Sequence, residues 1–320
     1  QLAEIFIEHK ESLGIGCEDG KIERINAGID AGAGIRVISG DSTAYAYTNI
    51  LTEDSLKNLA RVAAKAFTGG KGNPTLDFTT PKPLLEIDID IPPHQVSIED
   101  KVEKVKICDR AARSLDEKIR QVTVGYSDIL QKVTIANSEG IYVEDERIRT
   151  RFVCNAIASD GKSIQTGFTS LGGTKGFEIF KERDPKDMGI EAAQRALLML
   201  NAKPCPSGKM PVVLASEAGG TMVHEACGHG LEADLAQKGL SVYANKKGSQ
   251  VASELVTVVD DATIKAKYGS YRYDDEGTVG QKNVLIKNGI LEGYLYDKLT
   301  AKKEKRQSSG NGRRESYKER

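Results

Sequence analysis

The sequence predicts an α+β protein, in which antiparallel sheets are covered by a few helices and the chain divides into an N-terminal and a C-terminal portion. Apolar and polar residues alternate with period two from 121 to 167, the pattern of antiparallel strands with one buried face. Two stretches, 52–67 and 97–115, instead carry apolar residues at helical spacing. A histidine pair on a third predicted helix, His224 and His229, places a metal motif in the C-terminal portion.

The first 80 residues are expected to form a sheet with one covering helix. Strands are expected at 2–8, near 21–27, at 34–39 and at 45–49. Gly32-Ala33-Gly34 favours a turn or a close approach of another backbone. Thr52 precedes Glu53 and Asp54, which is typical of a helix start, and Gly69-Gly70 is expected to end that helix.

The middle of the chain predicts a linker, a helix, a meander and a second helix. Residues 69–93 are rich in glycine and proline, and His94 at their end is expected to be merely solvated. An amphipathic helix follows from Ser97 to about Leu115, with Cys108 on its apolar side as inert core. The alternating stretch is broken by turn signals at 137–140 and 159–162, and a helix is expected at 187–200. The acidic run 144–147 lies within the alternating stretch and is more typical of a solvated strand end or turn than of a carboxylate site.

The last third predicts strands around the histidine motif. Residues 202–208 read as a boundary, followed by an apolar strand at 210–215 that leads into the motif helix. Further strands are expected at 251–260 and 283–297, the second folded into a hairpin around Asn288-Gly289. The charged run 302–314 is expected to be a mobile surface loop.

Composition excludes several classes of function. The 320 residues are 39% hydrophobic and 28% charged with a formal net charge of −1, so no global charge favours nucleic acid or an anionic membrane. No apolar run approaches the roughly 18 residues of a membrane span, and no signal peptide opens the sequence. Five cysteines without paired spacing fit a reducing cytoplasm.

The motif His224-Glu225-Ala226-Cys227-Gly228-His229 has the spacing H-E-x-x-x-H. The zincin motif H-E-x-x-H places its histidines on one helix face. One further residue turns the rings about 140° apart on a regular helix. A one-residue π-bulge would bring them together again, and Gly228 would ease that distortion. Two imidazoles could then hold Zn²⁺ while Glu225 takes a proton from water. The alternative is a pair of unrelated histidines on a buried helix.

Longer blocks around this motif resemble the TldD/PmbA family, in its zinc-bearing TldD branch. The blocks are HEACGHGLEAD, SELVTVVDDAT, DDEGTVGQKNVLIKNGILEGYLYDKLTA and GNGRRESY, with weaker similarity in LAEIFIEHK and DAGAGIRVISGDSTAYAYTN. The family comprises intracellular metallopeptidases that are also labelled modulators of DNA gyrase, a label that the charge balance does not support. The resemblance implies Zn²⁺ ligands at His224 and His229 and a general base at Glu225.

The resemblance also implies residues outside the motif and the assembly. Asp275, Glu276, Arg313 and Arg314 match family blocks and are expected to line the substrate cleft; the alternative is a salt-bridged turn for each block. Family members work as homodimers or as TldD–PmbA-type heterodimers. The resulting domain prediction is an N-terminal subdomain at 1–80, a central helix and meander at 95–202, and an incomplete metallopeptidase domain at 205–320.

The sequence does not decide which residue is the third zinc ligand. Within the sequence the candidates are Cys227, Glu232, Asp234 and the pair Asp260-Asp261, of which Cys227 is expected to pack as a small apolar residue and Glu232 lies two helical turns past His224. In the family the third ligand is a cysteine further toward the C-terminus, and no cysteine follows Cys227. Gln1 also opens within a predicted strand, so we expect a chain that is cut at both ends and inactive as it stands.

Three classes of function follow. We favour a cytoplasmic, zinc-dependent metallopeptidase that hydrolyses unfolded or flexible peptides. A catalytically silent partner in a TldD–PmbA-type assembly is the alternative, against which the intact histidines and Glu225 speak. A structural metal or nucleic-acid module is disfavoured by the charge balance and by a glutamate placed between ligands of an open site.

Overall fold

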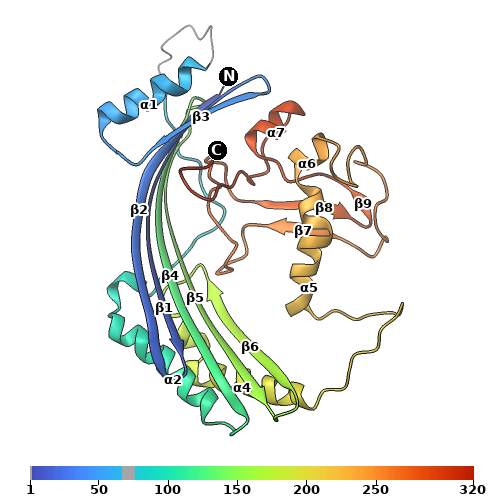
Figure 1. Ribbon diagram of the computed structural model, residues 1–320. Coiled ribbons are helices and arrows are strands. Elements are labelled where there is room, and N and C mark those ends of the chain that lie inside the picture. Colours follow the sequence, from blue (N-terminus) through green and yellow to red (C-terminus); the bar gives the residue numbers. More distant parts are fainter. Residues whose placement is uncertain (1, 67–75) are drawn as a thin grey trace.

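A six-stranded antiparallel sheet forms the frame of the molecule in the computed structural model, which describes residues 2–66 and 76–320 (Figure 1). Its strands run in the spatial order β3-β2-β1-β4-β5-β6. Their bounds are β1 Leu2–Glu18, β2 Lys21–Ser39, β3 Ser42–Thr48, β4 Ile119–Asn137, β5 Tyr142–Ser159 and β6 Ile164–Gly173. The α+β class and the meander between 121 and 167 are thereby confirmed.

The strands are much longer than the sequence suggests. The segments predicted as two strands at 21–27 and 34–39 are one strand, β2, of 19 residues, roughly 60 Å long at about 3.3 Å per residue. Gly32 and Gly34 stay in register opposite Glu8 and Phe6 of β1, so no turn forms there. The other expectation for this glycine run, a close approach of another backbone, is confirmed at Gly34, where a Cβ would lie 2.7 Å from the backbone oxygen of Tyr317. A Cβ at Gly32 would lie 2.2 Å from the ring of the same residue.

Helices cover the sheet where the capping signals place them. Their bounds are α1 Glu53–Lys65, α2 Ile98–Arg113, α3 Ile179–Glu182 and α4 Pro185–Leu200. The side chains of Thr52 and Ser97 accept hydrogen bonds from the backbone N–H groups of Ser55 and Asp100 and so cap α1 and α2. The expected helix end at Gly69-Gly70 lies outside the described residues.

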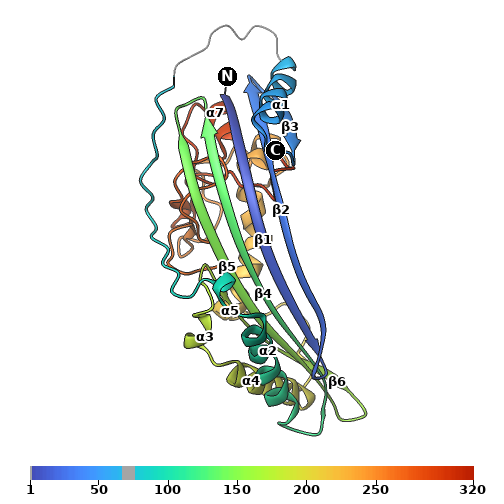
Figure 2. The same ribbon diagram turned by 90° about the vertical axis from the view of Figure 1, so that its left-hand side faces the viewer.

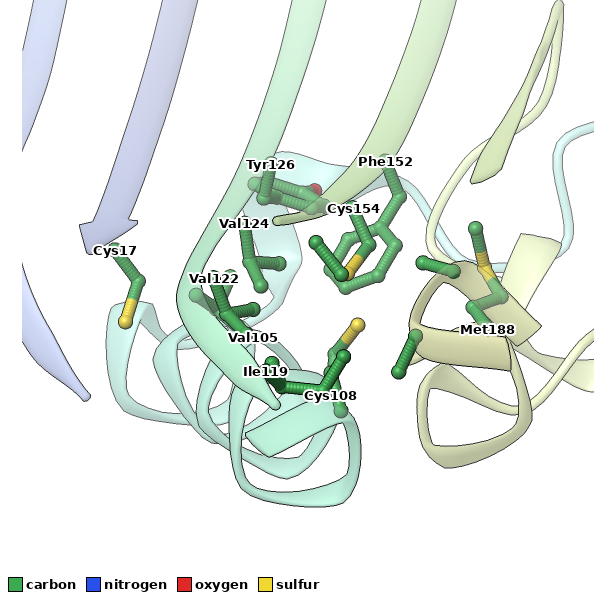
Figure 3. Packing of buried hydrophobic residues seen from close by; sticks show 14 of the residues in the cluster. Cys17, Val105, Cys108, Ile119, Val122, Val124, Tyr126, Phe152, Cys154 and Met188 are labelled. Carbon is green, nitrogen blue, oxygen red and sulfur yellow. The ribbon is translucent and has the colours of Figure 1, made fainter. Parts of the chain in front are cut away.

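The largest core lies between α2, α4 and the lower halves of β4 and β5 (Figure 3). Tyr126, Phe152, Cys154 and Met188 are nearly fully buried there, together with Cys108. Contact with the Cys154 thiol and burial both raise the pKa of Cys108, which keeps it in the unreactive thiol form. The expectation that Cys108 is inert core is confirmed.

The C-terminal portion packs on the opposite face of the sheet, near its upper end (Figures 1 and 2). Successive side chains of a strand point to opposite faces. Tyr126 of β4 faces the helix core, whereas the odd-numbered Val133 and Ile135 join a cluster with Tyr273 and Tyr317. The elements of this portion are α5 Ser216–Val223, α6 Ala233–Gln237, β7 Val258–Asp261, β8 Lys282–Lys287, β9 Ile290–Leu291 and α7 Lys298–Lys303.

Two strand predictions in this portion hold only in part. The hairpin at Asn288-Gly289 is confirmed, because β8 pairs with β9 across these residues and both have positive φ, 49° and 79°. The strands predicted at 251–260 and 283–297 shrink to β7 and to this short hairpin. The strand predicted at 210–215 is wrong. This stretch forms no strand and is exposed, with Val213 at 99%.

The surface loop expected at 302–314 holds only in part. Residues 302–307 are exposed, although 302 and 303 lie in α7. Ser309, Gly310 and Gly312 are instead buried within the C-terminal portion. Residues 2–48 and 119–173 contribute to one sheet, so the first two predicted domains are joined through β1 and β4. The division of the chain into domains stays a prediction.

Candidate metal centre

A single turn of π-helix carries the histidine motif. Helix α5 ends at Val223, and residues His224–Gly228 continue it as a π-helix. The backbone N–H of His229 donates to the carbonyl oxygen of His224, five residues back. This turn holds one more residue than an α-helical turn. The predicted π-bulge within H-E-x-x-x-H is therefore confirmed.

The π turn brings the three motif side chains together. The ring centroids of His224 and His229 are 4.3 Å apart, with the ring planes at 66°. Metal-ligating atoms of His224, Glu225 and His229 all lie within 4.8 Å of one another. The Glu225 Oε2 and His229 Nε2 atoms are 3.9 Å apart, and these two side chains are 67% and 51% exposed. Substrate and water can therefore reach all three groups.

Gly228 does not need the conformational freedom of glycine. Its φ and ψ are −56° and −55°, ordinary right-handed helical values. A Cβ there would lie 3.6 Å from Nδ1 of His224, an ordinary contact. The turn therefore does not require glycine at this position, and the expectation that Gly228 eases the distortion stays a prediction.

Glu232 is a functional candidate whose role the sequence analysis missed. It lies just after a 3₁₀ turn, His229–Leu231, where the backbone leaves the helical region with ψ at 127°. This break allows the Glu232 Oε1 atom to come within 2.8 Å of His229 Nδ1. The hydrogen bond to Glu232 is the largest cause that raises the pKa of His229. The spacing His229-x-x-Glu232 was a visible signal, because residues three apart are neighbours on a helical turn.

The other candidates for a third ligand are engaged elsewhere. The Cys227 Sγ–H donates to the Val223 carbonyl at 3.1 Å, and burial raises the pKa of this thiol as it packs against the core of the C-terminal portion. Asp234 pairs with Lys238 at 3.0 Å. Asp260 accepts a hydrogen bond from Asn311, and Asp261 accepts one from Thr263. In the described part of the chain, the group with metal-ligand spacing is the motif trio.

The predicted substrate-binding residues lie in a buried ion-pair network between the sheet and the C-terminal portion. Asp275 is 1% exposed and contacts Arg147 at 2.5 Å and Arg313 at 2.9 Å. Burial alone would raise the pKa of Asp275, but the charges of Arg147 and Arg313 outweigh it and lower the pKa. Two residues of the run 144–147 belong to this network, since Asp145 is buried and pairs with Arg147 and Arg272. The expected solvated segment therefore holds only for Glu144 and Glu146, which are exposed.

A second set of ion pairs holds the other two candidates. Arg314 pairs with Glu4 of β1 at 2.6 Å, and its side chain is 2% exposed. Glu276 is buried, pairs with Arg36 of β2 and accepts the backbone N–H of Lys298. Each of the four side chains thus has an ion-pair partner, as the alternative of salt-bridged segments expects.

A cavity of about 420 Å³ is lined by some of these residues and by Glu232, the hydrogen-bond partner of His229, but by none of the three motif residues. Glu232, Glu276, Arg313 and Arg314 all line it. Asp275 does not. A larger cavity of about 910 Å³ lies near Leu2 and α7 and contains no motif residue. The motif trio stays the candidate for the chemistry, because its exposed ligand-type atoms lie within 4.8 Å of one another. Direct substrate contact by the four residues stays a prediction.

Comparisons with known proteins agree with this arrangement. Three sequence models match in order along the chain: PmbA/TldA metallopeptidase domain 1 at 3–67, the central domain at 91–200 and the C-terminal domain at 207–320. Similar solved structures are a modulator of a DNA gyrase from Thermotoga maritima and TldE from Thermococcus kodakarensis. Their TM-scores are 0.83 and 0.74 at 23% and 21% identity, over 99% and 98% of this chain and 72% and 71% of theirs. These likenesses show the shared fold.

Closer relatives are named metalloproteases. A metalloprotease of Methanocaldococcus jannaschii is 39% identical over 98% of this chain and 70% of its own length. TldD homologues of Buchnera aphidicola and Haemophilus influenzae are 38% and 35% identical, over 94% and 98% of this chain and 64% and 67% of theirs. The chain thus spans about two thirds of the length of these relatives. No helix within residues 2–66 and 76–320 is both long and apolar enough to span a membrane. With three domain models in order and such identity over almost all of its residues, the chain belongs to the PmbA/TldD family of metallopeptidases.

Proposed function

We propose that this chain carries the catalytic centre of a zinc-dependent metallopeptidase that hydrolyses unfolded or flexible peptides. The observation that supports the proposal best is the π turn, which brings His224 and His229 within 4.3 Å, ring to ring, beside Glu225. His224 and His229 are the proposed ligands, and Glu225 is the proposed general base.

The donor set fits Zn²⁺. Imidazole nitrogens bind this ion at about 2.0–2.1 Å, so two ligands of one ion lie at most roughly 4 Å apart. The ligand atoms of the trio meet within 4.8 Å, a separation that small side-chain rotations would close. Imidazole also suits other transition metals, so zinc itself is part of the proposal. The third protein ligand that catalytic zinc usually has is, by family resemblance, a downstream cysteine.

The chain's own residues supply the proton transfers. A bound zinc ion would polarise the peptide carbonyl and lower the pKa of water to about 7. Glu225 takes one proton from the attacking water as the water oxygen bonds to the carbonyl carbon. The same carboxyl group gives that proton to the amide nitrogen as the C–N bond breaks. The products are a carboxylic acid and an amine, and Glu225 ends in its starting state.

Assembly and location are further parts of the proposal. We infer a homodimer, or a heterodimer with a PmbA-type homologue, without nucleic acid or membrane as a partner. Cysteine spacing supports a cytoplasmic location. The alternative function is a catalytically silent subunit. The fold alone does not decide between the two functions, since a protein named TldE shares it. The cluster of His224, Glu225 and His229 favours a catalytic subunit.

The substitution Glu225→Gln in the full-length protein tests the proposal. Gln cannot accept the proton but changes the side-chain volume little, so zinc content measured by mass spectrometry should stay at one per chain. Peptide turnover should fall about 10²–10⁴-fold, the usual contribution of a general base. The matched control is Glu254→Gln, at an exposed carboxylate of the same portion, which should leave turnover unchanged. Normal turnover of the Glu225→Gln protein would refute the assigned role.

A further inference from the structure

We propose that Glu232 is a positioning residue that fixes which ring nitrogen of His229 faces the metal. The inference rests on the proposed metal centre and extends it by one residue. Glu232 Oε1 lies 2.8 Å from His229 Nδ1. The other ring nitrogen, Nε2, faces the side of Glu225, 3.9 Å from its Oε2 atom. Each nitrogen of the ring thus has its own carboxylate.

The hydrogen bond determines the tautomer of His229. An ionised carboxylate can only accept hydrogen bonds, so the proton between the two groups lies on Nδ1. In the neutral ring, Nε2 is then left with a free lone pair, the form that binds a metal. Because the two ring nitrogens point in diverging directions, a carboxylate bonded to Nδ1 lies away from an ion bound to Nε2. In this geometry Glu232 orients a ligand and is not itself the third ligand.

Glu232 is well anchored for this role. It forms a parallel bridge with Leu295, and the flanking backbone hydrogen bonds are Ala233 N–H to the Leu295 oxygen at 2.9 Å and Leu295 N–H to the Leu231 oxygen at 2.8 Å. Leu231 and Ala233 are fully buried in the core of the C-terminal portion. The backbone that carries Glu232 is therefore tied to packed structure, while its side chain, 40% exposed, reaches toward the exposed motif residues.

Carboxylate groups behind metal-bound histidines stabilise the orientation of the ring and increase its basicity. Loss of such a partner typically weakens metal binding by about 10–100-fold. Glu232 also lines the 420 Å³ cavity together with Arg313 and Arg314. It is thus the residue that the metal centre and this cavity share.

The test begins with the tautomer in metal-free, full-length protein labelled with ¹⁵N-histidine. Long-range ¹H–¹⁵N spectra above the pKa of His229, assigned with a His229→Gln protein, should show the Nδ1–H form in the wild type. Glu232→Ala should shift this ring toward the Nε2–H form that free histidine favours. Glu232→Gln, whose amide oxygen can still accept a hydrogen bond, should retain Nδ1–H. An unchanged tautomer in Glu232→Ala would overturn the proposal without bearing on the proposed function.

The second readout is Zn²⁺ affinity, measured by competition with a chromophoric chelator. Glu232→Ala should bind zinc about 10–100-fold more weakly than the wild type, and Glu232→Gln should recover part of the loss. The control Glu292→Ala removes an exposed carboxylate of the same portion and should bind zinc like the wild type. If Glu232→Ala shifts the His229 tautomer but binds Zn²⁺ as tightly as the wild type does, Glu232 does not position His229 for the metal and the proposal is overturned. A wild type that binds no zinc would instead refute the proposed function.

Discussion

The imidazole rings of His224 and His229 lie with their centroids 4.3 Å apart, although five positions separate them along the chain. On a regular α-helix this spacing would turn them about 140° from one another. The hydrogen bond from the His229 N–H to the His224 oxygen adds one residue to the turn and removes most of that angle. Deleting or inserting one residue in the motif should therefore change whether the two rings converge.

A deletion and an insertion at Ala226 test this relationship. Ala226 is exposed, so its own contacts are not at issue. Deleting it gives H-E-x-x-H, which converges on a regular helix, and zinc affinity of the full-length protein should stay within about tenfold. Inserting one alanine after it places the rings on different sides of either helix type. Affinity should then fall by at least the roughly 10–100-fold that loss of an outer-shell partner costs.

Chelator competition measures both proteins. The deletion protein serves as the control, because it carries the same disturbance of chain length as the insertion protein. Retained zinc binding after the insertion would show that the π turn does not set the ligand geometry.

Substrate selection follows from the open backbone near the motif. The apolar stretch before α5 includes Val212 at 71% and Val213 at 99% exposure, and β7 is an edge strand of the small sheet. Such edges accept extended peptides through main-chain hydrogen bonds, largely independently of side chains. We therefore expect the full-length enzyme to cleave disordered peptides and to spare folded proteins. The family resemblance adds the expectation of a dimer.

To check this expectation, the rate of cleavage is measured for a folded protein and for its denatured form at equal concentration. Equal rates for the two forms would contradict the expected selection of unfolded substrates. Size-exclusion chromatography with light scattering reports the oligomer, and an active species that is strictly monomeric would contradict the dimer.

Local signals in the sequence were sufficient for several features of this fold. The caps at Thr52 and Ser97, the hairpin at Asn288-Gly289 and the π turn each depend on residues within a few positions. Their energetics are short-range, so a pattern of five or six residues determines them.

Long-range pairing could not be predicted in this way. Arg314 reads as a charged loop residue, yet it is buried because Glu4, 310 residues away, neutralises it. The stretch at 210–215 has the apolar composition of a strand, but a strand also needs a neighbour for its N–H and C=O groups, and composition does not reveal a neighbour. Glu232 was considered only as a zinc ligand, so its pairing with His229 three residues earlier was not used as a signal.

Replacing Gly32 should reveal how tightly the C-terminal segment packs on the sheet. A Cβ at this position would lie 2.2 Å from Cε2 of Tyr317, so Gly32→Ala must displace a buried ring. The expected destabilisation is about 1–3 kcal/mol, the usual cost of overpacking, measured by urea unfolding. Gly28→Ala, on the same strand, is the control, because its Cβ would meet only Ser12 Oγ at 4.0 Å. Equal stability of the two variants would contradict the close approach.

The ion pair between Asp275 and Arg147 should make the attachment of the C-terminal portion pH-dependent. Removing one partner of a buried pair costs about 3–5 kcal/mol, so Asp275→Asn should lower the free energy of unfolding by that amount at pH 7. The pKa of Asp275 is lowered in the folded protein, so its ionised form stabilises the fold. This contribution is complete above the unfolded value of about 3.9 and is lost as the pH falls through the lower, folded value.

The difference in stability between wild type and Asp275→Asn should therefore be constant from pH 7 to about 5 and shrink below about 4. Urea unfolding at a series of pH values measures it. Asp88→Asn is the control, since Asp88 and Lys265 form an exposed pair at 77% and 71% exposure, whose contribution is at most about 1 kcal/mol. A difference that persists unchanged to pH 3 would show that Asp275 acts through its shape rather than its charge, because below the unfolded value protonation of the unfolded chain already reduces the stability of the wild type relative to Asp275→Asn.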